Sequence, residues 1–409
     1  MPGIPSVEQI RSHFPALGRE LNGRPFAYFD GPGGTQVPRA VAEAVSDYLL
    51  RRNANTHGAF ATSQETDAIL AAARAAVADF LGAGPREVVF GQNMTTLTFQ
   101  LSRSLAQSWR PGDEIVVTQL DHQANVAPWR LAAAERGVTV RTLPFHPESC
   151  TLAYEQMAEL IGPRTRLVAV GAASNAVGTI NEVRRLADAA HAAGALCFVD
   201  AVHYAPHRLV DVAALGADFL ACSAYKFFGP HLGILWGREA LLAELQPYKV
   251  PPASDAAPER WETGTLNHEG IAGTRAAVDW IAGLAGWAGG GGRRDALRAA
   301  MEGLRHHEDA LFERVLAGLR SSRGVRVYGV APGAPRTPTV GFTVAGRTPG
   351  EVARALAEEA LCVWDGDFYA STVIERLGLA ESGGLVRVGL APYNDAGEVE
   401  RLLQAVEGL

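Results

Sequence analysis

Short apolar runs alternate with longer stretches of helical period over the first two thirds of the chain. Segments such as 66–83 place apolar residues at the three- and four-residue spacing of an amphipathic helix. Between such segments stand short runs rich in β-branched and aromatic residues, which are typical of buried strands. These runs cover residues 87–91, 113–120, 165–174, 196–202, 218–224 and 233–237. The alternation predicts an α/β fold, with a mostly parallel sheet covered by helices on both faces.

After about residue 280 the pattern changes. A glycine-rich connection, "GWAGGGGRRD", leads into a long helical segment over 294–319. Two strand-like runs, a helix, the run "LVRVGLAPYN" and a closing helix follow. This order predicts a smaller α+β unit. We therefore expect a large domain over 18–285 and a small domain formed by 1–17 together with 286–409.

Composition and charge narrow the class of protein. The chain has 409 residues, of which 47% are hydrophobic and 20% charged, so it is long enough to bury a large core. Its net charge of -7 and its scattered lysines and arginines argue against a nucleic-acid partner. No apolar stretch is long enough to cross a bilayer, and the first residues do not resemble a secretion signal. We expect a cytoplasmic protein without a membrane partner.

The cysteines give no sign of a metal site or a disulfide framework. There are four, and they show neither a CxxC pair nor the spacing of zinc ligands. A chain of this size does not need disulfides for stability. We therefore expect reduced thiols and no bound metal.

A lone aspartate and a lone lysine end two of the predicted strands. Asp200 closes "ALCFVD", and Lys226 closes "SAYK" at the end of the next strand. Taken alone, the two make an ordinary charge pair at the rim of a sheet. A lysine desolvated among aromatic residues, however, holds a neutral amine that can condense with an aldehyde. Pyridoxal phosphate requires such an amine and a carboxylate at its ring nitrogen, and these residues fit both roles.

Other strand ends carry groups that suit the rest of this cofactor. The backbone near Met94 and Thr95 opens a predicted helix and could hold a phosphate, to which the hydroxyl group of Ser223 could add a hydrogen bond. His122 could stack on the pyridine ring, and Asn175 could donate to its ring oxygen. Each has an ordinary alternative: a threonine N-cap, a polar loop histidine and an Asx turn. Five candidate residues follow five successive predicted strands. Together they favour a cofactor site more strongly than any single candidate does.

From "YFDGPGGTQVP" at residue 28 to "LAPYNDAGEVERLL" at 390, the chain resembles the class V aminotransferase family, in its cysteine desulfurase and selenocysteine lyase branch. The resemblance implies fold type I of the pyridoxal-phosphate enzymes, with a seven-stranded sheet, and gives the candidates above their cofactor-binding roles. It also implies that Gly264 and Thr265 reach the cofactor phosphate of a neighbouring subunit, which predicts a homodimer. Arg387 matches the arginine that binds the substrate carboxylate, for which a bidentate guanidinium is well suited.

Three positions depart from the family pattern. His203 stands where a glutamine usually follows the aspartate by three residues, and Tyr225 replaces the histidine before the lysine. Both keep a polar group, so cofactor binding is expected. In desulfurases a loop cysteine accepts sulfur as a persulfide, and here Tyr369 occupies that position. The nearest thiol, Cys362, lies in an apolar, strand-like run and is expected to be buried and inert.

These features predict a pyridoxal-phosphate enzyme acting on an amino acid, with Lys226 as the base at the α-carbon. We expect a carbon-sulfur lyase that eliminates a sulfur group from cysteine or a cysteine conjugate, with Tyr369, Tyr225 or His203 as the proton donor. The alternatives are a true cysteine desulfurase using Cys362 or an external acceptor, and an aminotransferase or epimerase. A non-catalytic protein that keeps the fold is a further alternative.

Overall fold

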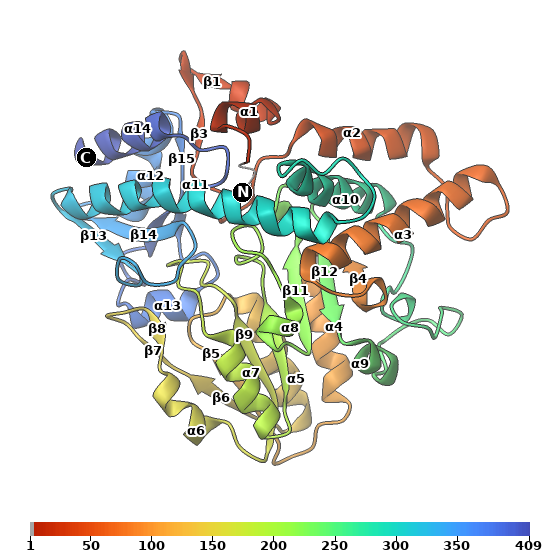
Figure 1. Cartoon of the computed structure of the whole chain (residues 1–409). Coiled ribbons are helices and arrows are strands. Elements are labelled where there is room, and N and C mark those ends of the chain that lie inside the picture. Colours follow the sequence, from red (N-terminus) through yellow and green to blue (C-terminus); the bar gives the residue numbers. More distant parts are fainter. Residues whose placement is uncertain (1–3) are drawn as a thin grey trace.

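The computed structural model describes residues 4–409 and confirms the predicted α/β class (Figure 1). The main sheet has seven strands in the order β4-β12-β11-β10-β9-β5-β6. All of them point the same way except β12, which runs antiparallel to both of its neighbours. The strands are β4 (Val88–Gly91), β5 (Glu114–Thr118), β6 (Thr139–Leu143), β9 (Thr165–Gly171), β10 (Leu196–Asp200), β11 (Phe219–Ser223) and β12 (Gly233–Gly237).

Each of the six predicted strands is present, but the sequence pattern missed β6. The sequence of β6 is "TVRTL", and only its last residue, Leu143, is buried. An edge strand with one neighbour need not carry the continuous apolar run of a central parallel strand. The expectation of five successive strands is therefore wrong in detail, since β6 intervenes along the chain. In the sheet, β5, β9, β10 and β11 are nevertheless adjacent, and β4 points in the same direction beyond β12.

Helices cover both faces of this sheet, as predicted. Alternate strand residues face opposite sides: Val168 and Val170 belong to one buried cluster, and Leu167 and Ala169 to another. Helices α4, α5 and α9 contribute to the second cluster, whereas α3, α7, α8 and α10 contribute to the first. The helices of this part are α2 (Arg39–Asp47), α3 (Ala61–Leu81), α4 (Met94–Ala106), α5 (Ala127–Arg136), α6 (Met157–Leu160), α7 (Val183–Ala192), α8 (Val212–Leu215), α9 (Glu239–Glu244) and α10 (His268–Gly283).

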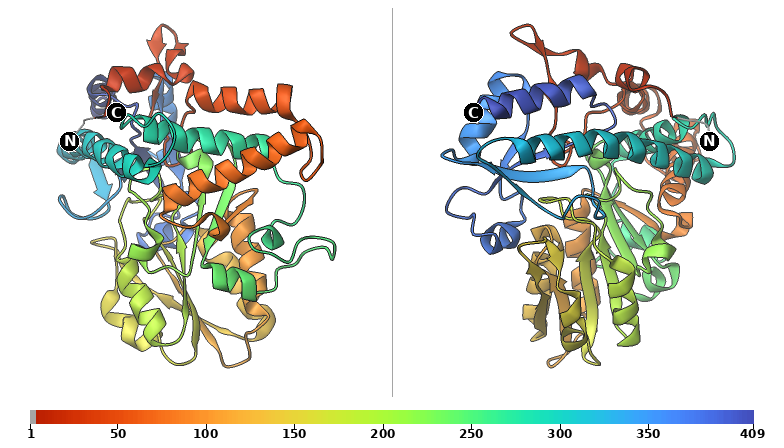
Figure 2. Two further views of the ribbon diagram at one scale, coloured as in Figure 1. Left: turned by 45° about the vertical axis from the view of Figure 1, so that its right-hand side comes forward. Right: turned by 60° about the vertical axis from the view of Figure 1, so that its left-hand side comes forward.

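A second sheet of four antiparallel strands forms the predicted α+β unit, in the order β13-β14-β17-β16. It has its own buried cluster, which includes Phe342 and Val386. The long helix α11 runs across the molecule between the α3 and α10 region and this sheet (Figures 1 and 2). The elements are β13 (Val325–Tyr328), β14 (Thr339–Val344), β16 (Trp364–Gly366), β17 (Leu385–Gly389), α11 (Arg293–Ser321), α12 (Pro349–Glu358), α13 (Ser371–Arg376) and α14 (Ala396–Glu407).

The start of the chain contacts its end. In α1 (Val7–Ser12), the Arg11 guanidinium group donates to Glu398 at 2.8 Å. These contacts agree with the assignment of residues 1–17 to the small unit, although the domain boundaries stay a prediction. The remaining short strands are β1 (Glu20–Leu21), β2 (Arg24–Pro25), β3 (Ala27–Tyr28), β7 (Phe145–His146), β8 (Thr151–Leu152) and β15 (Leu361–Cys362), of which β15 pairs with β3.

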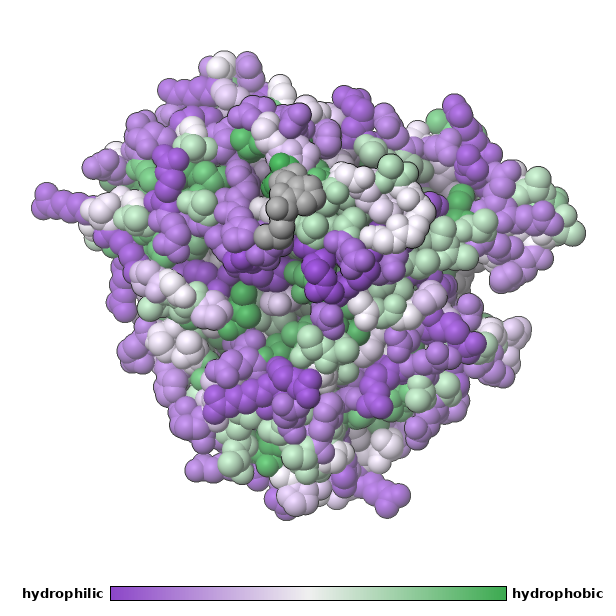
Figure 3. All heavy atoms as spheres, in the orientation of Figure 1, coloured by the Kyte–Doolittle hydropathy of each residue, from purple (hydrophilic) through white to green (hydrophobic). Residues whose placement is uncertain are grey.

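The visible surface is mainly hydrophilic. Figure 3 shows polar side chains over most of this face, with apolar residues scattered among them. Within residues 4–409, no helix combines the length and the apolar character needed to cross a membrane.

A buried ion pair holds the outer strand of the main sheet. Arg74 on α3 binds both oxygens of Glu262, at 2.8 and 2.7 Å, and also donates to the Val88 carbonyl group. The Phe90 N–H group donates to the same carboxylate at 2.9 Å. The pair thereby joins α3, β4 and the segment that leads to Gly264.

We predict that Arg74→Met lowers the free energy of unfolding by about 3 kcal/mol, because it leaves the Glu262 carboxylate buried without its cation. Urea unfolding followed by circular dichroism measures this change. The matched control is Arg86→Met, which removes an exposed pair with Glu239 (side chains 69% and 47% exposed) and should change stability little. Equal losses in the two variants would contradict the prediction.

Candidate active site

Lys226 lies in the last turn of a short 3-10 helix, Ala224–Lys226, that directly follows β11. Its ammonium nitrogen donates to the Pro32 carbonyl oxygen and lies 4.8 Å from the centre of the Tyr225 ring. Burial, with a further contribution from the Arg387 charge, lowers the pKa of Lys226 to about 7. A neutral amine is therefore available near neutral pH.

Asp200 ends β10, the neighbour of β11, and is in register with Ala221. One carboxylate oxygen accepts from the Val202 N–H group at 2.9 Å, and the other has no hydrogen-bond partner in the described chain. Burial raises the pKa of Asp200 to about 6, and the Lys226 charge opposes this shift. The structure thus brings the predicted amine and carboxylate to adjacent strand ends.

His122 follows β5, and Asn175 follows β9. The His122 Nδ1 atom accepts from the Ala124 N–H group at 3.0 Å, and burial lowers the pKa of this histidine to about 4. The ring is therefore neutral at physiological pH. The Asn175 amide nitrogen donates to the Phe368 carbonyl oxygen at 2.9 Å, whereas its buried Oδ1 atom has no partner.

The start of α4 offers free hydrogen-bond donors. Asn93 caps this helix through the Thr96 N–H group, so Thr95 is not the N-cap. Thr95 is exposed, and its hydroxyl group makes no hydrogen bond within residues 4–409. The Met94 N–H group donates to the Ser223 hydroxyl oxygen at 3.1 Å. A helix N-terminus with such donors is suited to a phosphate.

Two of the three residues expected to depart from the family pattern, His203 and Tyr225, lie against other rings. His203 is buried, its Nε2 atom lies 3.0 Å from the Thr337 hydroxyl oxygen, and burial holds its pKa well below the usual range. The Tyr225 ring stacks on the His231 ring with centres 4.9 Å apart, and burial raises the pKa of its phenol. Each is therefore neutral near pH 7.

Arg387 reaches the site from β17 of the small sheet. Its side chain is buried, and burial lowers its pKa to about 9. One terminal nitrogen donates to the Asn175 carbonyl oxygen at 3.0 Å, and the guanidinium carbon lies 4.1 Å from the centre of the Phe368 ring. The buried Nε atom has no partner. The Nε edge of the guanidinium group therefore lacks an acceptor within the described chain.

Hydrogen bonds and backbone conformation define the shape of the segment around Tyr369, which is expected to replace the family's cysteine loop. Tyr369 is 70% exposed, and its ring centre lies 5.5 Å from that of His122. Its carbonyl group accepts from the Gln123 N–H group at 2.7 Å. Phe368 and Tyr369 both have φ near +55°, a region that non-glycine residues rarely adopt. Such backbone strain is characteristic of functional segments.

Cys362 lies in β15 and not in a loop. It pairs with Tyr28 of β3, and its carbonyl group accepts from the Phe29 N–H group. Burial raises the pKa of its thiol to about 11. The other three cysteines are buried. The described chain therefore presents no activated thiol at this site.

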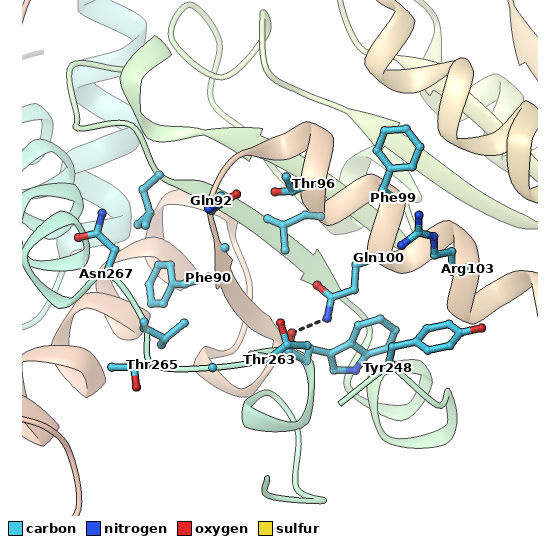
Figure 4. A pocket seen from close by; sticks show the side chains of 16 residues that line it. Phe90, Gln92, Thr96, Phe99, Gln100, Arg103, Tyr248, Thr263, Thr265 and Asn267 are labelled. Carbon is cyan, nitrogen blue, oxygen red and sulfur yellow. Dashed lines mark hydrogen bonds between the residues drawn. The ribbon is translucent and has the colours of Figure 1, made fainter. Parts of the chain in front are cut away.

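Gly264 and Thr265 lie apart from the residues around Lys226. They line a hollow of about 650 Å³, together with Gln92 and Thr96 at the start of α4, and neither Lys226 nor Asp200 lines it (Figure 4). At one side of the hollow, the Gln100 amide donates to the Trp261 carbonyl oxygen at 2.7 Å.

Sequence reasoning missed three residues of the site: Asp30, Trp364 and Phe368. Burial raises the pKa of Asp30 to about 6, and the charges of Arg387 and Lys226 oppose this shift. Asp30 follows the run "FAYF" and precedes a glycine- and proline-rich turn, a signal similar to that of Asp200. The two aromatic residues gave no such signal, because only tertiary contacts place them beside Arg387.

The residues present fit pyridoxal phosphate and an amino-acid substrate. Buried polar atoms in folded proteins nearly always have partners, yet Asp30 Oδ1, Asn175 Oδ1 and Arg387 Nε have none. Other groups of the site are the Lys226 amine, which is partly neutral near pH 7, a carboxylate oxygen of Asp200 without a partner, and the N-terminus of α4. A phosphorylated aldehyde and a carboxylate-bearing substrate match these groups in charge and chemistry.

Comparisons with known proteins agree with this chemistry. The model of the family described as Aminotransferase class-V matches residues 27–402. A probable cysteine desulfurase of Pseudomonas aeruginosa is 34% identical over 411 residues, covering 97% of this chain and 96% of that protein. The aminotransferase-like protein FGM3 of Gibberella zeae is also 34% identical, and the alignment covers 98% of each chain.

Solved structures are similar over the full length. The apo structure of a cysteine desulfurase from Thermococcus onnurineus has a TM-score of 0.89 at 30% identity, covering 100% of this chain and 99% of that one. The cysteine desulfurase CsdA from Escherichia coli has a TM-score of 0.85 at 28% identity, covering 99% and 98%. Members of this family use pyridoxal phosphate. The chain therefore belongs to the class V aminotransferase family and is a pyridoxal-phosphate enzyme of the cysteine desulfurase-like branch.

Proposed function

We propose that this enzyme is a carbon-sulfur lyase, which eliminates the sulfur group from the β-carbon of cysteine or a cysteine conjugate. The observation that carries the proposal is the lack of an activated thiol. Tyr369 stands where the resemblance places the persulfide cysteine, and the Cys362 thiol has a pKa of about 11 in a paired strand. Elimination needs no sulfur-accepting side chain on the protein.

The substrate carboxylate binds at the edge of the Arg387 guanidinium group that carries Nε. The Nε atom of this residue is buried without a partner, and a carboxylate supplies two acceptor oxygens in the plane of a guanidinium group. Asn175 holds one terminal nitrogen of Arg387 through its carbonyl oxygen, which fixes the orientation of that edge. The α-carbon of the substrate is thereby directed toward Lys226.

Lys226 removes the proton from the α-carbon. Its depressed pKa lets the amine act as a base near neutral pH, where an ordinary lysine is almost wholly protonated. Pyridoxal phosphate, when bound, withdraws electrons from the α-carbon, and Asp200 is placed to keep its ring nitrogen protonated. His122 is neutral and flat beside the site, which suits stacking on an aromatic ring.

Breaking the bond between Cβ and sulfur releases a thiolate, which takes the bonding electron pair and needs one proton. The phenol of Tyr369 is the proposed donor, because its segment borders the site and its ring lies beside His122. With one water consumed, a substrate RS–CH2–CH(NH3+)–COO− gives a thiol, pyruvate and ammonium. Tyr225 and His203 are less suited, since stacking and a hydrogen bond to Thr337 already engage their rings.

The second candidate function is cysteine desulfuration with an external sulfur acceptor. It is favoured by the names of the relatives, several of which are cysteine desulfurases. The two functions differ in the carbon product: desulfuration of cysteine yields alanine, whereas elimination yields pyruvate and ammonia.

We predict that the enzyme forms pyruvate and sulfide from cysteine, with little alanine, and that Cys362→Ser changes neither product nor rate by more than about twofold. The reason is that a thiol with a pKa of about 11 contributes almost no thiolate at pH 7.5. Chromatography of the keto acid and of alanine measures the outcome. Alanine as the main product, lost in Cys362→Ser while the cofactor spectrum persists, would establish the desulfurase instead.

We also predict the pH dependence of cofactor capture by the apoprotein. With a Lys226 pKa of about 7, the neutral amine accumulates as pH rises through 7 and is fully available by about pH 8.5. Arg387→Met removes a positive charge that lowers this pKa, so the midpoint should move to higher pH. Stopped-flow absorbance of pyridoxal phosphate uptake measures the midpoint.

Arg326→Met serves as the control for that experiment, since Arg326 is an exposed arginine on β13. Its midpoint should stay near 7. A wild-type rate that keeps rising to pH 10, as for an unperturbed lysine, would contradict the assignment of Lys226.

We further propose a homodimer in which Gly264 and Thr265 contribute to the partner's phosphate site. The support is the position of these residues in an open hollow beside the start of α4, away from their own Lys226. Thr265→Ala should weaken cofactor binding about tenfold by removing one hydrogen bond to a charged phosphate. Equilibrium dialysis at fixed protein concentration checks this, and light scattering checks the dimer.

A further inference from the structure

Trp364 is an exposed aromatic residue that the proposed reaction does not use. It lies on β16, directly opposite Arg387 of β17, so the two side chains are on the same face of the small sheet. A Cβ atom at Gly33 would collide with the Trp364 indole ring, which places the indole against this glycine. The carbonyl oxygen of the preceding residue, Pro32, accepts the hydrogen bond from Lys226. Trp364 therefore lies opposite Arg387 and beside the turn that contacts the Lys226 amine.

Tyr369 supplies a second exposed ring in the same segment, beside His122. The side chains of Trp364 and Tyr369 are 52% and 70% exposed, although large aromatic surfaces are usually buried. Both belong to one short segment, 364–369. The inward ring of that segment, Phe368, covers the Arg387 guanidinium group. Thus the rings of Trp364 and Tyr369 are exposed to solvent, whereas the ring of Phe368 packs on the guanidinium group of Arg387.

The segment that carries these rings has a fixed conformation. The carbonyl oxygens of Phe368 and Tyr369 each accept a hydrogen bond, from the Asn175 amide nitrogen and from the Gln123 N–H group respectively. The Gln123 amide also donates to the Ser371 hydroxyl oxygen at 2.8 Å. Because these bonds hold the backbone on both sides of the turn, the exposed rings present a rigid surface rather than a mobile loop.

The charge around the rings selects among substrates. Asp367 is exposed in the same segment and lies close enough to His122 to influence its pKa, whereas Asp365 points toward Gly350 at the start of α12. The positive groups of the site, Lys226 and Arg387, are occupied by the proposed chemistry. An anionic group held by this segment would meet the exposed carboxylate of Asp367, so an apolar group is favoured.

We propose that Trp364 and Tyr369 form a binding subsite for an apolar, planar group attached to the substrate sulfur. The preferred substrates are then cysteine thioethers that carry such a group, such as a benzyl or aryl substituent, rather than free cysteine. This inference rests on the proposed lyase function, because it assigns the substituent that leaves with the sulfur.

Binding of an unreactive analogue tests the subsite independently of the reaction. The probe is 3-(benzylsulfanyl)propanoate, which lacks the amine, and it is compared with 3-sulfanylpropanoate by calorimetry on the holoenzyme. Burying the benzyl group against two rings should give at least about tenfold tighter binding. Trp364→Ala should abolish this difference, and Trp364→Phe should retain most of it.

Leu131→Ala is the matched control, because Leu131 is another exposed apolar side chain (56%) and lies on α5. It should leave both affinities unchanged. Equal affinities of the two probes in the wild type would overturn the subsite. So would tighter binding of the benzyl probe that survives Trp364→Ala.

Turnover separates failure of the subsite from failure of the function. S-benzylcysteine should have a kcat/KM at least about tenfold above that of cysteine, and Trp364→Ala should collapse this ratio. Pyruvate from cysteine without a benzyl preference would overturn the subsite and leave the lyase. Benzyl-dependent binding without pyruvate would overturn the lyase alone. Preferential turnover of S-sulfocysteine, whose sulfur carries an anionic group, over S-benzylcysteine would also contradict the subsite.

Discussion

The structure of the site depends on the burial of two cations beside two carboxylates. Lys226 and Arg387 are both buried, and burial lowers the pKa of Lys226 to about 7 and that of Arg387 to about 9. Asp30 and Asp200 are buried at the same site, and burial raises the pKa of each to about 6. The desolvation free energy of so many ionisable groups is large, and a fold retains such a cluster where chemistry requires it.

The parallel strands of the main sheet bring most of this cluster together, because the residues that follow them lie at the same edge of the sheet. Strands β5, β9, β10 and β11 are adjacent and share a direction, so the residues that follow them meet along one edge. Arg387 approaches from the other sheet, and its hydrogen bond to the Asn175 carbonyl oxygen joins the two units at the site. The residues after the strands are therefore positioned by the sheet, and Arg387 by the contact between the two sheets.

The segment 364–369 brings aromatic rings close to Arg387 and His122. Two successive residues with positive φ turn Phe368 onto Arg387 and leave Tyr369 outside. Hydrogen bonds to Asn175 and Gln123 compensate the strain of that turn. The consequence is one ring packed on the Arg387 guanidinium group and a second ring beside His122.

The sequence by itself determined the class of fold, six of the seven main strands and the amine and carboxylate at two strand ends, because burial pattern and chain direction are local properties. It did not reveal β6, whose single neighbour relaxes the need for apolar residues, nor the true cap of α4, which is Asn93. Only the tertiary structure placed Asp30, Phe368 and Trp364 around Arg387, since Asp30 comes from the other end of the chain, Phe368 from a turn and Trp364 from a neighbouring strand. The titration of Lys226 was likewise decided by folding, because a pKa depends on the burial and charges that only the assembled cavity supplies.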